Sequence, residues 1–405
     1  IVEDARWVDS YWNITIKVPE DVDFGLYGLE LEYAGIKIFQ PRSVWVHEET
    51  PDSLTIAHVT DVHYSLNPEK FEAIMNELNF LGVDLAIITG DCADMGSNEK
   101  EMQGFYKTLQ IARFPTYVLP GNHDHVGGIS NYVNYIGPTN YTVDLGFALL
   151  VTMDTGKDGY AGMEQIRWAE SRLKSKPPET FKILAFHHPF FQYTVNITGG
   201  WENIESLKQY MYSSWATSLN DSRALLKAIQ ETRVDLILTG HIHRDEVLIL
   251  NQMHYFIVTT TAGGPTPPGM PNGYRLIKLK KNGTSYVIES LKFNPGPMTA
   301  KPHSIEAEKL MVKYGPVNDG STQAVTVIIR NGWSREAAGT IVVLVSSRSK
   351  ADEYRVFGEG PQLEYVGSTS TYHVFRAMVV LEPGDSYRFT LATQRDEKPP
   401  LSLIH

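Results

Sequence analysis

Seven short apolar runs dominate the sequence between residues 54 and 260, and amphipathic stretches separate them. The runs are Leu54–Thr60, Val83–Thr89, Thr116–Leu119, Phe147–Met153, Phe181–Phe186, Val234–Thr239 and Tyr255–Thr260. Short continuous apolar runs are typical of strands that are buried on both faces. Strands that alternate with helices form layered α/β domains, so this pattern predicts an α/β fold.

The best helix candidate lies between the first two runs. Asn67 is placed to cap it, Pro68 suits its first position, and Gly82 ends it. Its apolar residues fall on one face, namely Phe71, Ile74, Met75, Leu78 and Leu81. Two further helices are expected over Gly162–Lys174 and Asp221–Thr232.

The regions on either side of the α/β pattern have β texture. Residues 1–52 contain short alternating stretches, at Asn13–Val18, Leu26–Tyr33 and Ser43–Val46. A segment of this length seldom forms a hydrophobic core alone. We therefore expect it to dock on another part of the chain. The α/β domain itself is expected over residues 53–293.

Residues 303–394 are expected to form a small β-sandwich domain of immunoglobulin-like type. Its predicted strands are Ala324–Arg330, Thr340–Ser346, His373–Leu381 and Tyr387–Ala392. Residues 395–405 show no periodicity and are expected to be a fraying tail.

Composition excludes several classes of protein. The 36 Lys and Arg against 47 Asp and Glu give a net charge of −11, which makes general nucleic-acid binding unlikely as a function. No uninterrupted apolar run is long enough for a transmembrane segment, so none is expected. The single cysteine, Cys92, cannot form an intrachain disulfide.

The cellular location stays open. A lone cysteine is typical of a reducing compartment such as the cytoplasm. The chain begins at Ile1 rather than Met, however, and carries five N-x-S/T sequons, at Asn13, Asn140, Asn196, Asn220 and Asn282. These features favour an exported or cell-surface protein, with chance occurrence of the sequons as the alternative.

We single out the metal-ligating residue types that follow five of the seven runs. The segments are Asp61-Val62-His63, Gly90-Asp91, Gly121-Asn122-His123-Asp124, His187-His188-Pro189 and Gly240-His241-Ile242-His243. Carboxyl ends of strands in layered α/β folds converge on one edge, so these side chains are expected to meet there. Oxygen ligands combined with imidazoles suit Zn, Mn or Fe.

This set of segments resembles the calcineurin-like metallophosphoesterase superfamily over roughly Leu54–Phe293. The family's blocks are D-x-H, G-D, G-N-H-D/E, H and G-H-x-H, and all five are present in order. The resemblance implies a two-sheet β-sandwich flanked by helices, with a site for two metal ions at one edge.

The resemblance also implies a role for each residue. The first metal ion would be held by Asp61, His63, Asp91 and His243, and the second by Asp91, Asn122, His187 and His241. Asp91 would then bridge both ions. His187 is preferred to His188 because the family's ligand usually lies two residues before the proline, and His188 stays the alternative.

Two metal ions at such a site can activate a bridging hydroxide for in-line attack on phosphorus. By the same resemblance, His123 would assist the leaving oxygen, and Asp124 would orient its imidazole. We therefore expect two divalent or trivalent cations, Zn, Mn or Fe, as cofactors.

Two positions depart from the patterns of related families. Asp94 stands where purple acid phosphatases have a tyrosine, so no tyrosinate–iron colour is expected. Asp124 stands where calcineurin and the dinuclear 5′-nucleotidases usually have glutamate. At both positions the sequence is more similar to cyclic-nucleotide and glycerophosphodiester phosphodiesterases.

Substrate contacts are expected from the loops beside the metal ions. Candidates are His125, Tyr64, Tyr160 and Arg244, although a surface salt bridge is an equal alternative for Arg244. The segment Phe190–Trp215 is long, aromatic and poorly periodic. It is either a lid that stacks on substrate or a satellite hydrophobic cluster.

The leading function is a metal-dependent phosphoesterase that hydrolyses a small phosphomonoester or phosphodiester. The alternatives are a metal-dependent nuclease and a non-enzymatic cell-surface binding protein on the same fold. All expected ligand positions carry ligating residues, which favours catalysis over a binding role. The sequence leaves the oligomeric state open.

Overall fold

The computed structural model describes residues 2–8, 11–289, 296–297 and 305–393. The chain divides into two compact units, one ending at Pro51 and the other beginning at Asp52. The first unit consists of two antiparallel hairpins. They are formed by β1 (Val2–Val8) with β2 (Tyr11–Ile16), and β3 (Gly25–Tyr33) with β4 (Ile36–Val46). The expected docking of this segment stays a prediction.

The second unit contains a six-stranded sheet, and the first three predicted ligand segments follow strands of this sheet. Its main path is β16 (Ser285–Ile288), β15 (Gly273–Asn282), β5 (Ser53–Val59), β6 (Leu85–Thr89) and β7 (Thr116–Leu119), with β18 (Ile305–Glu306) beside β15. Strands β5, β6 and β7 run parallel, so their carboxyl ends lie at the same edge.

The other two predicted ligand segments follow strands of an eight-stranded sheet. Its order is β17 (Gly296–Pro297), β11 (Val195–Ile197), β13 (Glu246–Leu250), β14 (His254–Val258), β12 (Leu236–Thr239), β10 (Phe181–Ala185), β9 (Ala148–Thr152) and β8 (Thr142–Asp144). Strands β9, β10, β12 and β14 are parallel. The predicted α/β class is therefore confirmed, with the seven predicted strands divided between two sheets.

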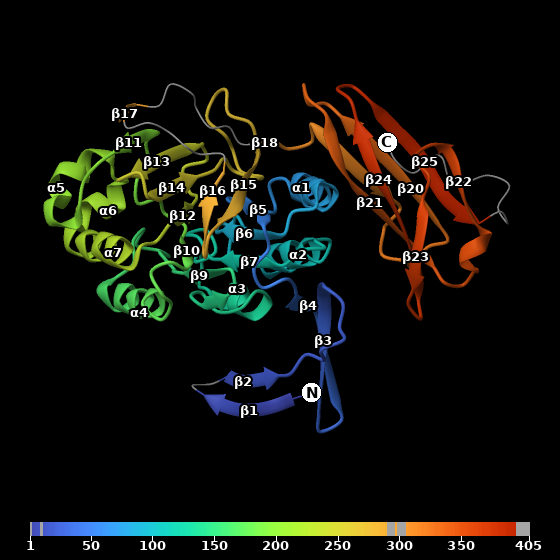
Figure 1. Ribbon diagram of the computed structural model, residues 1–405, viewed down its shortest axis with the longest axis horizontal. Helices are drawn as coiled ribbons and strands as arrows, with labels where there is room; N and C mark the ends of the chain where they lie inside the picture. The colour runs from blue at the N-terminus through green and yellow to red at the C-terminus, as the bar shows by residue number, and fades with distance from the viewer. Residues whose placement is uncertain (1, 9–10, 290–295, 298–304, 394–405) are drawn as a thin grey trace. The chain divides into compact units, whose positions relative to one another are not determined.

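Helices cover the two sheets on separate sides (Figure 1). The six-stranded sheet shares its core with α1 (Pro68–Leu81), α2 (Glu99–Leu109) and α3 (Ser130–Tyr135). The eight-stranded sheet shares its core with α4 (Met163–Leu173), α5 (Ile204–Leu207), α6 (Ser213–Thr217) and α7 (Leu219–Thr232). None of the helices in the described ranges is long and apolar enough to cross a bilayer.

Helix α1 has the predicted bounds, but its capping differs from the prediction. The Asn67 side chain makes no cap hydrogen bond. Its Nδ2 donates instead to the carbonyl of Gly263, 3.2 Å away. At the other end Gly82 adopts φ +64°, and its N–H donates to the Leu78 carbonyl, as expected of a glycine C-cap.

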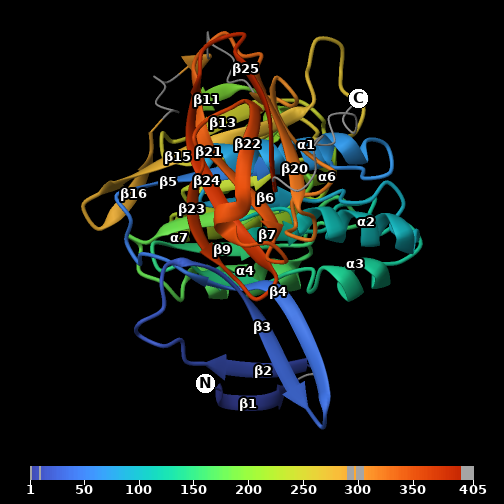
Figure 2. The ribbon, with the colours of Figure 1, turned by 90° about the vertical axis from the view of Figure 1, so that its right-hand side faces the viewer.

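Residues 310–393 form two antiparallel sheets (Figure 2). One contains β19 (Leu310–Gly315), β20 (Ala324–Asn331), β25 (Ser386–Thr393) and β22 (Tyr354–Glu359), and the other β21 (Ala337–Ser346), β24 (Tyr372–Leu381) and β23 (Glu364–Ser368). Their assignment as an immunoglobulin-like domain stays a prediction. The predicted tail at residues 395–405 lies outside the described residues.

Phe80 joins α1 to these C-terminal strands. Its side chain is 1% exposed and belongs to the same buried cluster as Leu310, Ile341 and Val343. A Cβ on Gly339 of β21 would overlap the Phe80 carbonyl, so this glycine permits the close approach of the two backbones.

Phe80→Ala should lower the free energy of unfolding by about 3–5 kcal/mol, because it leaves a cavity where the helix meets the strands. Urea denaturation followed by circular dichroism measures the change. Met378→Ala is the control: this side chain is 73% exposed, so its loss should cost no more than about 0.5 kcal/mol. Equal effects of the two substitutions would contradict the packing role of Phe80.

Candidate metal centre

The predicted ligands come together at the carboxyl ends of strands from both sheets. Two groups of side chains have ligand atoms that lie within 4.8 Å of one another. They are Asp61, His63 and His243, and Asp91, His187 and His241. A third such group contains His63, Asp91 and His123. The sequence predicted one converging edge; the structure builds it from β5, β6 and β7 of one sheet and β10 and β12 of the other.

Five of these residues adopt a left-handed backbone conformation. Their φ values lie between 42° and 73°, and they are Asp61, His63, Asp91, His241 and His243. Such conformations cost about 1–3 kcal/mol each in a residue with a side chain, and they cluster at functional sites. Backbone hydrogen bonds hold two of them, since Asp61 N donates to Gly90 O (3.0 Å) and His63 N donates to Asp91 O (2.9 Å).

The two carboxylates are each fixed through one oxygen. Asp61 Oδ2 accepts from the His241 amide at 2.8 Å, and Asp91 Oδ1 accepts from the His123 amide at 2.9 Å. The second oxygen of each faces the imidazoles. Asp61 Oδ1 lies 3.2 Å from His243 Nε2, and Asp91 Oδ2 lies 3.2 Å from His187 Nε2.

Three of the imidazoles are held from behind through Nδ1. The acceptors are the Thr89 carbonyl for His187 (2.7 Å), the Asp94 carboxylate for His63 (3.2 Å) and the Pro265 carbonyl for His243. Carbonyl and carboxylate oxygens only accept, so Nδ1 carries the hydrogen and Nε2 points into the cluster. His241 differs, because its Nε2 lies 2.8 Å from the Tyr212 hydroxyl.

The charges in this cluster shift the pKa of its members. Burial opposes charge on His187, but the carboxylates of Asp91 and Asp61 outweigh it and raise its pKa to about 10. Burial would also raise the pKa of Asp61 and Asp91, but the neighbouring imidazoles hold both below their usual range. The two carboxylates are therefore ionised and attract positive charge into the cluster.

The donor atoms fit metal ions. Asn122 Oδ1 is buried and has no hydrogen-bond partner among the described residues. Asp61 Oδ1 and His187 Nε2 are also buried, and they make the ion-pair contacts given above but no hydrogen bond of good geometry. Orphaned buried polar atoms are costly unless another group binds them. Oxygen and imidazole donors without thiolate suit divalent first-row cations. This chain's residues therefore fit the implied metal ions.

The geometry favours His187 over His188 as the ligand. His187 Nε2 belongs to the group with Asp91 and His241. The His188 ring is also buried, but its Nδ1 lies 3.0 Å from the Thr155 hydroxyl, outside that group. The ligand role of His187 remains a proposal.

The expected contact between Asp124 and the His123 ring is wrong. The Asp124 carboxylate accepts from three backbone amides, those of Cys92 (3.2 Å), Ala93 (3.0 Å) and Gly121 (2.8 Å). It therefore ties together the loops that follow β6 and β7. His123 Nδ1 donates instead to the Asp94 carbonyl, 2.7 Å away.

The four residues predicted to contact substrate have different partners in the structure. The Tyr64 hydroxyl lies 3.1 Å from Thr108 Oγ1 of α2, so Tyr64 is anchored to that helix. Arg244 pairs with Glu246 at 3.2 Å, which is the salt bridge considered as its alternative. His125 Nε2 lies 3.0 Å from Asp154 Oδ1, and the Tyr160 ring packs against Trp215.

The aromatic segment Phe190–Trp215 is mainly a core element. Phe190, Phe191 and Trp215 are at most 2% exposed and belong to the cluster beneath the eight-stranded sheet. They cannot stack on a substrate, so the alternative of a hydrophobic cluster holds for them. Tyr212 is the member of the segment that reaches the metal-ligand groups.

Sequence reasoning missed the contacts that three residues make at the candidate site or with the predicted residue His125 beside it. Asp94 holds both His63 and His123, and Asp154 contacts His125. Asp154 directly follows the predicted strand Phe147–Met153, so reading the residue after every strand would have found it. Nothing in the sequence indicated that Tyr212 contacts His241.

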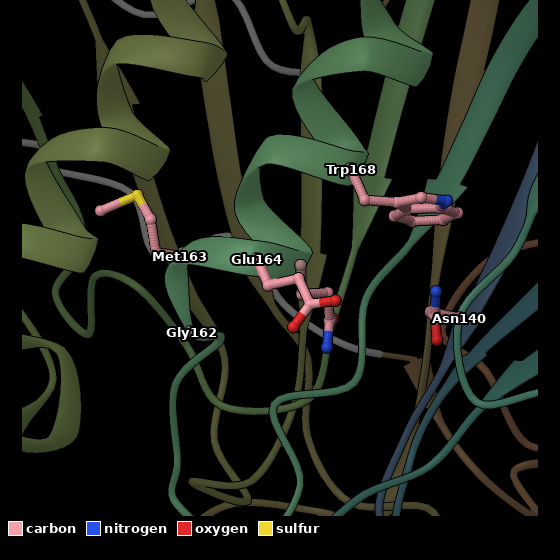
Figure 3. A pocket seen from close by; sticks show the side chains of 6 residues that line it. Asn140, Gly162, Met163, Glu164 and Trp168 are labelled. Atoms are coloured by element: carbon pink, nitrogen blue, oxygen red, sulfur yellow. The ribbon is translucent and has the colours of Figure 1, made fainter.

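A separate pocket of about 520 Å³ opens at the start of α4 (Figure 3). It is lined by Asn140, Gly162, Met163, Glu164, Gln165 and Trp168. None of the predicted ligands lines it, so the candidate site is the cluster at the strand ends.

Known proteins resemble the part of the chain that carries this site. A family model described as calcineurin-like phosphoesterase matches residues 54–245. A probable glycerophosphodiester phosphodiesterase, GpdQ, of Arcobacter nitrofigilis is 28% identical over 193 residues, which are 45% of this chain and 63% of that protein. The alignment thus spans less than two thirds of that relative's length.

Two other similarities are more distant. A probable cyclic nucleotide phosphodiesterase of a Synechococcus species is 22% identical over 252 residues, which are 57% of this chain and 90% of that protein. Among solved structures, a purple acid phosphatase from yellow lupin has a TM-score of 0.44 at 13% identity, covering 74% of this chain and 55% of the lupin chain.

Asp91→Asn should remove at least one bound metal ion, because the amide lacks the charge that two cations would share. Elemental analysis of the protein after loading with Mn²⁺ and desalting measures the loss. Asp158→Asn is the matched control, since Asp158 is an exposed carboxylate in the loop after β9. Full metal content in Asp91→Asn would disprove the bridging role.

Proposed function

The chain belongs to the calcineurin-like phosphoesterase family through residues 54–245, and on this basis we propose that it is a metal-dependent hydrolase of small phosphate esters. The observation that carries the proposal is the pair of buried carboxylates, Asp61 and Asp91, each with one oxygen turned toward imidazole Nε2 atoms. Such an arrangement is suited to holding cations next to each other.

Two cations would be shared between two sets of residues. Asp61, His63, Asp91 and His243 form the first set, and Asp91, Asn122, His187 and His241 form the second. When bound, the cations would lower the pKa of an attacking water and neutralise charge on the phosphate oxygens. The protein's own part is to orient these donors, which the hydrogen bonds behind the rings accomplish.

His123 is the residue best suited to meet the leaving oxygen. Its side chain is 37% exposed, whereas those of His63 and His187 are 3% and 0% exposed. Because Nδ1 donates to the Asp94 carbonyl, Nε2 is the atom left to hold a proton. A proton given from Nε2 to the leaving alkoxide would act as general acid catalysis.

Phosphodiesters are the favoured substrate class. The relatives' names, glycerophosphodiester phosphodiesterase and cyclic nucleotide phosphodiesterase, support it, as does Asp124 in place of glutamate. The net charge of −11 disfavours a nuclease, because the protein would repel a phosphate backbone. The complete set of donors disfavours a purely non-enzymatic binding protein.

Export also stays a proposal. Of the sequon asparagines, Asn13, Asn220 and Asn282 are exposed, Asn140 is half-buried, and Asn196 in β11 is 5% exposed. Four of the five are therefore accessible to glycosylation in the folded protein, and mass spectrometry of peptides from the native source would test for glycans.

The decisive assay compares bis-p-nitrophenyl phosphate with p-nitrophenyl phosphate after metal-free protein is reloaded with Mn²⁺, Zn²⁺ or Fe²⁺. We expect hydrolysis of the diester to exceed that of the monoester. A reversed preference would make the protein a phosphomonoesterase. No turnover of either ester, with bound metal confirmed by elemental analysis, would favour the binding-protein alternative.

His123→Ala should leave the metal content unchanged and reduce kcat by about 100-fold or more, the usual effect of losing a general acid. Steady-state kinetics and elemental analysis on the same sample measure both. Because His123 also lies within ligand distance of His63 and Asp91, loss of metal from the variant would instead identify it as a ligand.

A further inference from the structure

The four predicted ligand imidazoles are not held in the same way. Three donate from Nδ1 to an oxygen outside the cluster and direct Nε2 inward. His241 is the exception, because its Nε2 lies 2.8 Å from the Tyr212 hydroxyl. This contact occupies Nε2, so Nδ1 is the atom that His241 has left to offer a cation.

The choice of nitrogen determines where the donor atom lies. Nδ1 is adjacent to the Cγ atom of the ring, whereas Nε2 is at its far end, so exchanging them moves the donor atom. A hydrogen bond to one ring nitrogen selects both the tautomer and the orientation of the ring. Tyr212 can therefore determine whether His241 reaches the same cation as Asp91 and His187.

Hydrogen bonds on both sides hold the backbone of Tyr212 in place. Tyr212 N donates to the Phe190 carbonyl at 3.0 Å, and the Tyr212 carbonyl accepts from Ala216 N at 2.9 Å. Its ring meets the His241 ring edge to face, with centroids 5.2 Å apart. The buried side chains of Phe190 and Trp215 pack beneath this backbone, so the core fixes the phenol's position.

We propose that Tyr212 is a positioning residue that directs His241 Nδ1 toward Asp91 and His187, and so sets the cation affinity of that one site. The inference rests on the proposed metal centre, and it concerns only the second of the two sites. The first site has its own support, since Asp94 holds His63 and the Pro265 carbonyl holds His243.

The test is isothermal titration of the metal-free, full-length protein with Mn²⁺. Wild type should bind two equivalents. Tyr212→Phe keeps the ring and removes the hydroxyl, so one of the two binding steps should weaken by about 10- to 100-fold while the other stays unchanged. Asp94→Asn, which acts on His63, should weaken the other step.

Tyr193→Phe is the matched control, because Tyr193 belongs to the same segment and is 45% exposed. It should bind Mn²⁺ as wild type does. Thermal unfolding of the metal-free proteins should give the same midpoint for wild type and Tyr212→Phe, which separates a positioning effect from misfolding. If Tyr212→Phe is destabilised, Tyr212→Gln is the second variant. Its side-chain amide oxygen can accept a hydrogen bond from His241 Nε2, so it should restore part of the Mn²⁺ affinity.

Electron paramagnetic resonance gives a second readout. At two equivalents of Mn²⁺ and low concentration, wild type should show a coupled pair, and Tyr212→Phe the signal of isolated Mn²⁺. Two unchanged binding steps in Tyr212→Phe, or equal weakening of both, would overturn the inference, as would a wild type that binds no Mn²⁺. The inference and the proposed function can fail separately. If Tyr212→Phe weakens one Mn²⁺ step but the wild type hydrolyses neither ester, the inference holds and the proposed function is rejected.

Discussion

The hydrogen bond from the His241 amide to the Asp61 carboxylate joins the two sheets at the candidate metal centre. Asp61 follows β5 of one sheet, and His241 follows β12 of the other. The approach is close enough that a Cβ on Gly240 would overlap the Thr60 hydroxyl, so only glycine fits there. Both Asp61 and His241 adopt left-handed backbone conformations to make this bond, and the surrounding contacts must offset that cost.

The sequence predicted the fold class and the parallel strands that precede the candidate ligands, because buried runs are visible in a single chain. It did not predict how those strands divide between two sheets, since periodicity reports burial and not partners. Strand β15 shows the reason: it pairs with β5, bringing Leu279 opposite Leu54, more than two hundred positions away. A pairing so distant in the chain leaves no local pattern, and β13 and β15 were not among the predicted strands.

Residue types at the strand ends predicted which side chains gather, but not which atoms they present. Asp124 illustrates this limit, because its expected and observed contacts differ, and so does Asp94, for which no contact was expected. The Asp124 carboxylate is fully buried and satisfied by three amides, and burial together with the Asp91 charge raises its pKa to about 6. Asp94, three residues after Asp91, is the one that contacts His63. Loop conformation decides between them, and sequence spacing does not report it.

The aromatic segment connects core packing to the chemistry of the site. Phe190 and Trp215 are buried where a lid was considered, yet their packing fixes Tyr212 beside His241. Each of the two proposed sites therefore has one imidazole held by a backbone carbonyl and one contacted by a side chain. A backbone carbonyl, like that of Thr89 behind His187, cannot be removed by substituting a side chain, whereas a phenol can. Under our proposal, the Asp94 carboxylate at the first site and the Tyr212 hydroxyl at the second are thus the side chains outside the ligand set that can tune cation affinity.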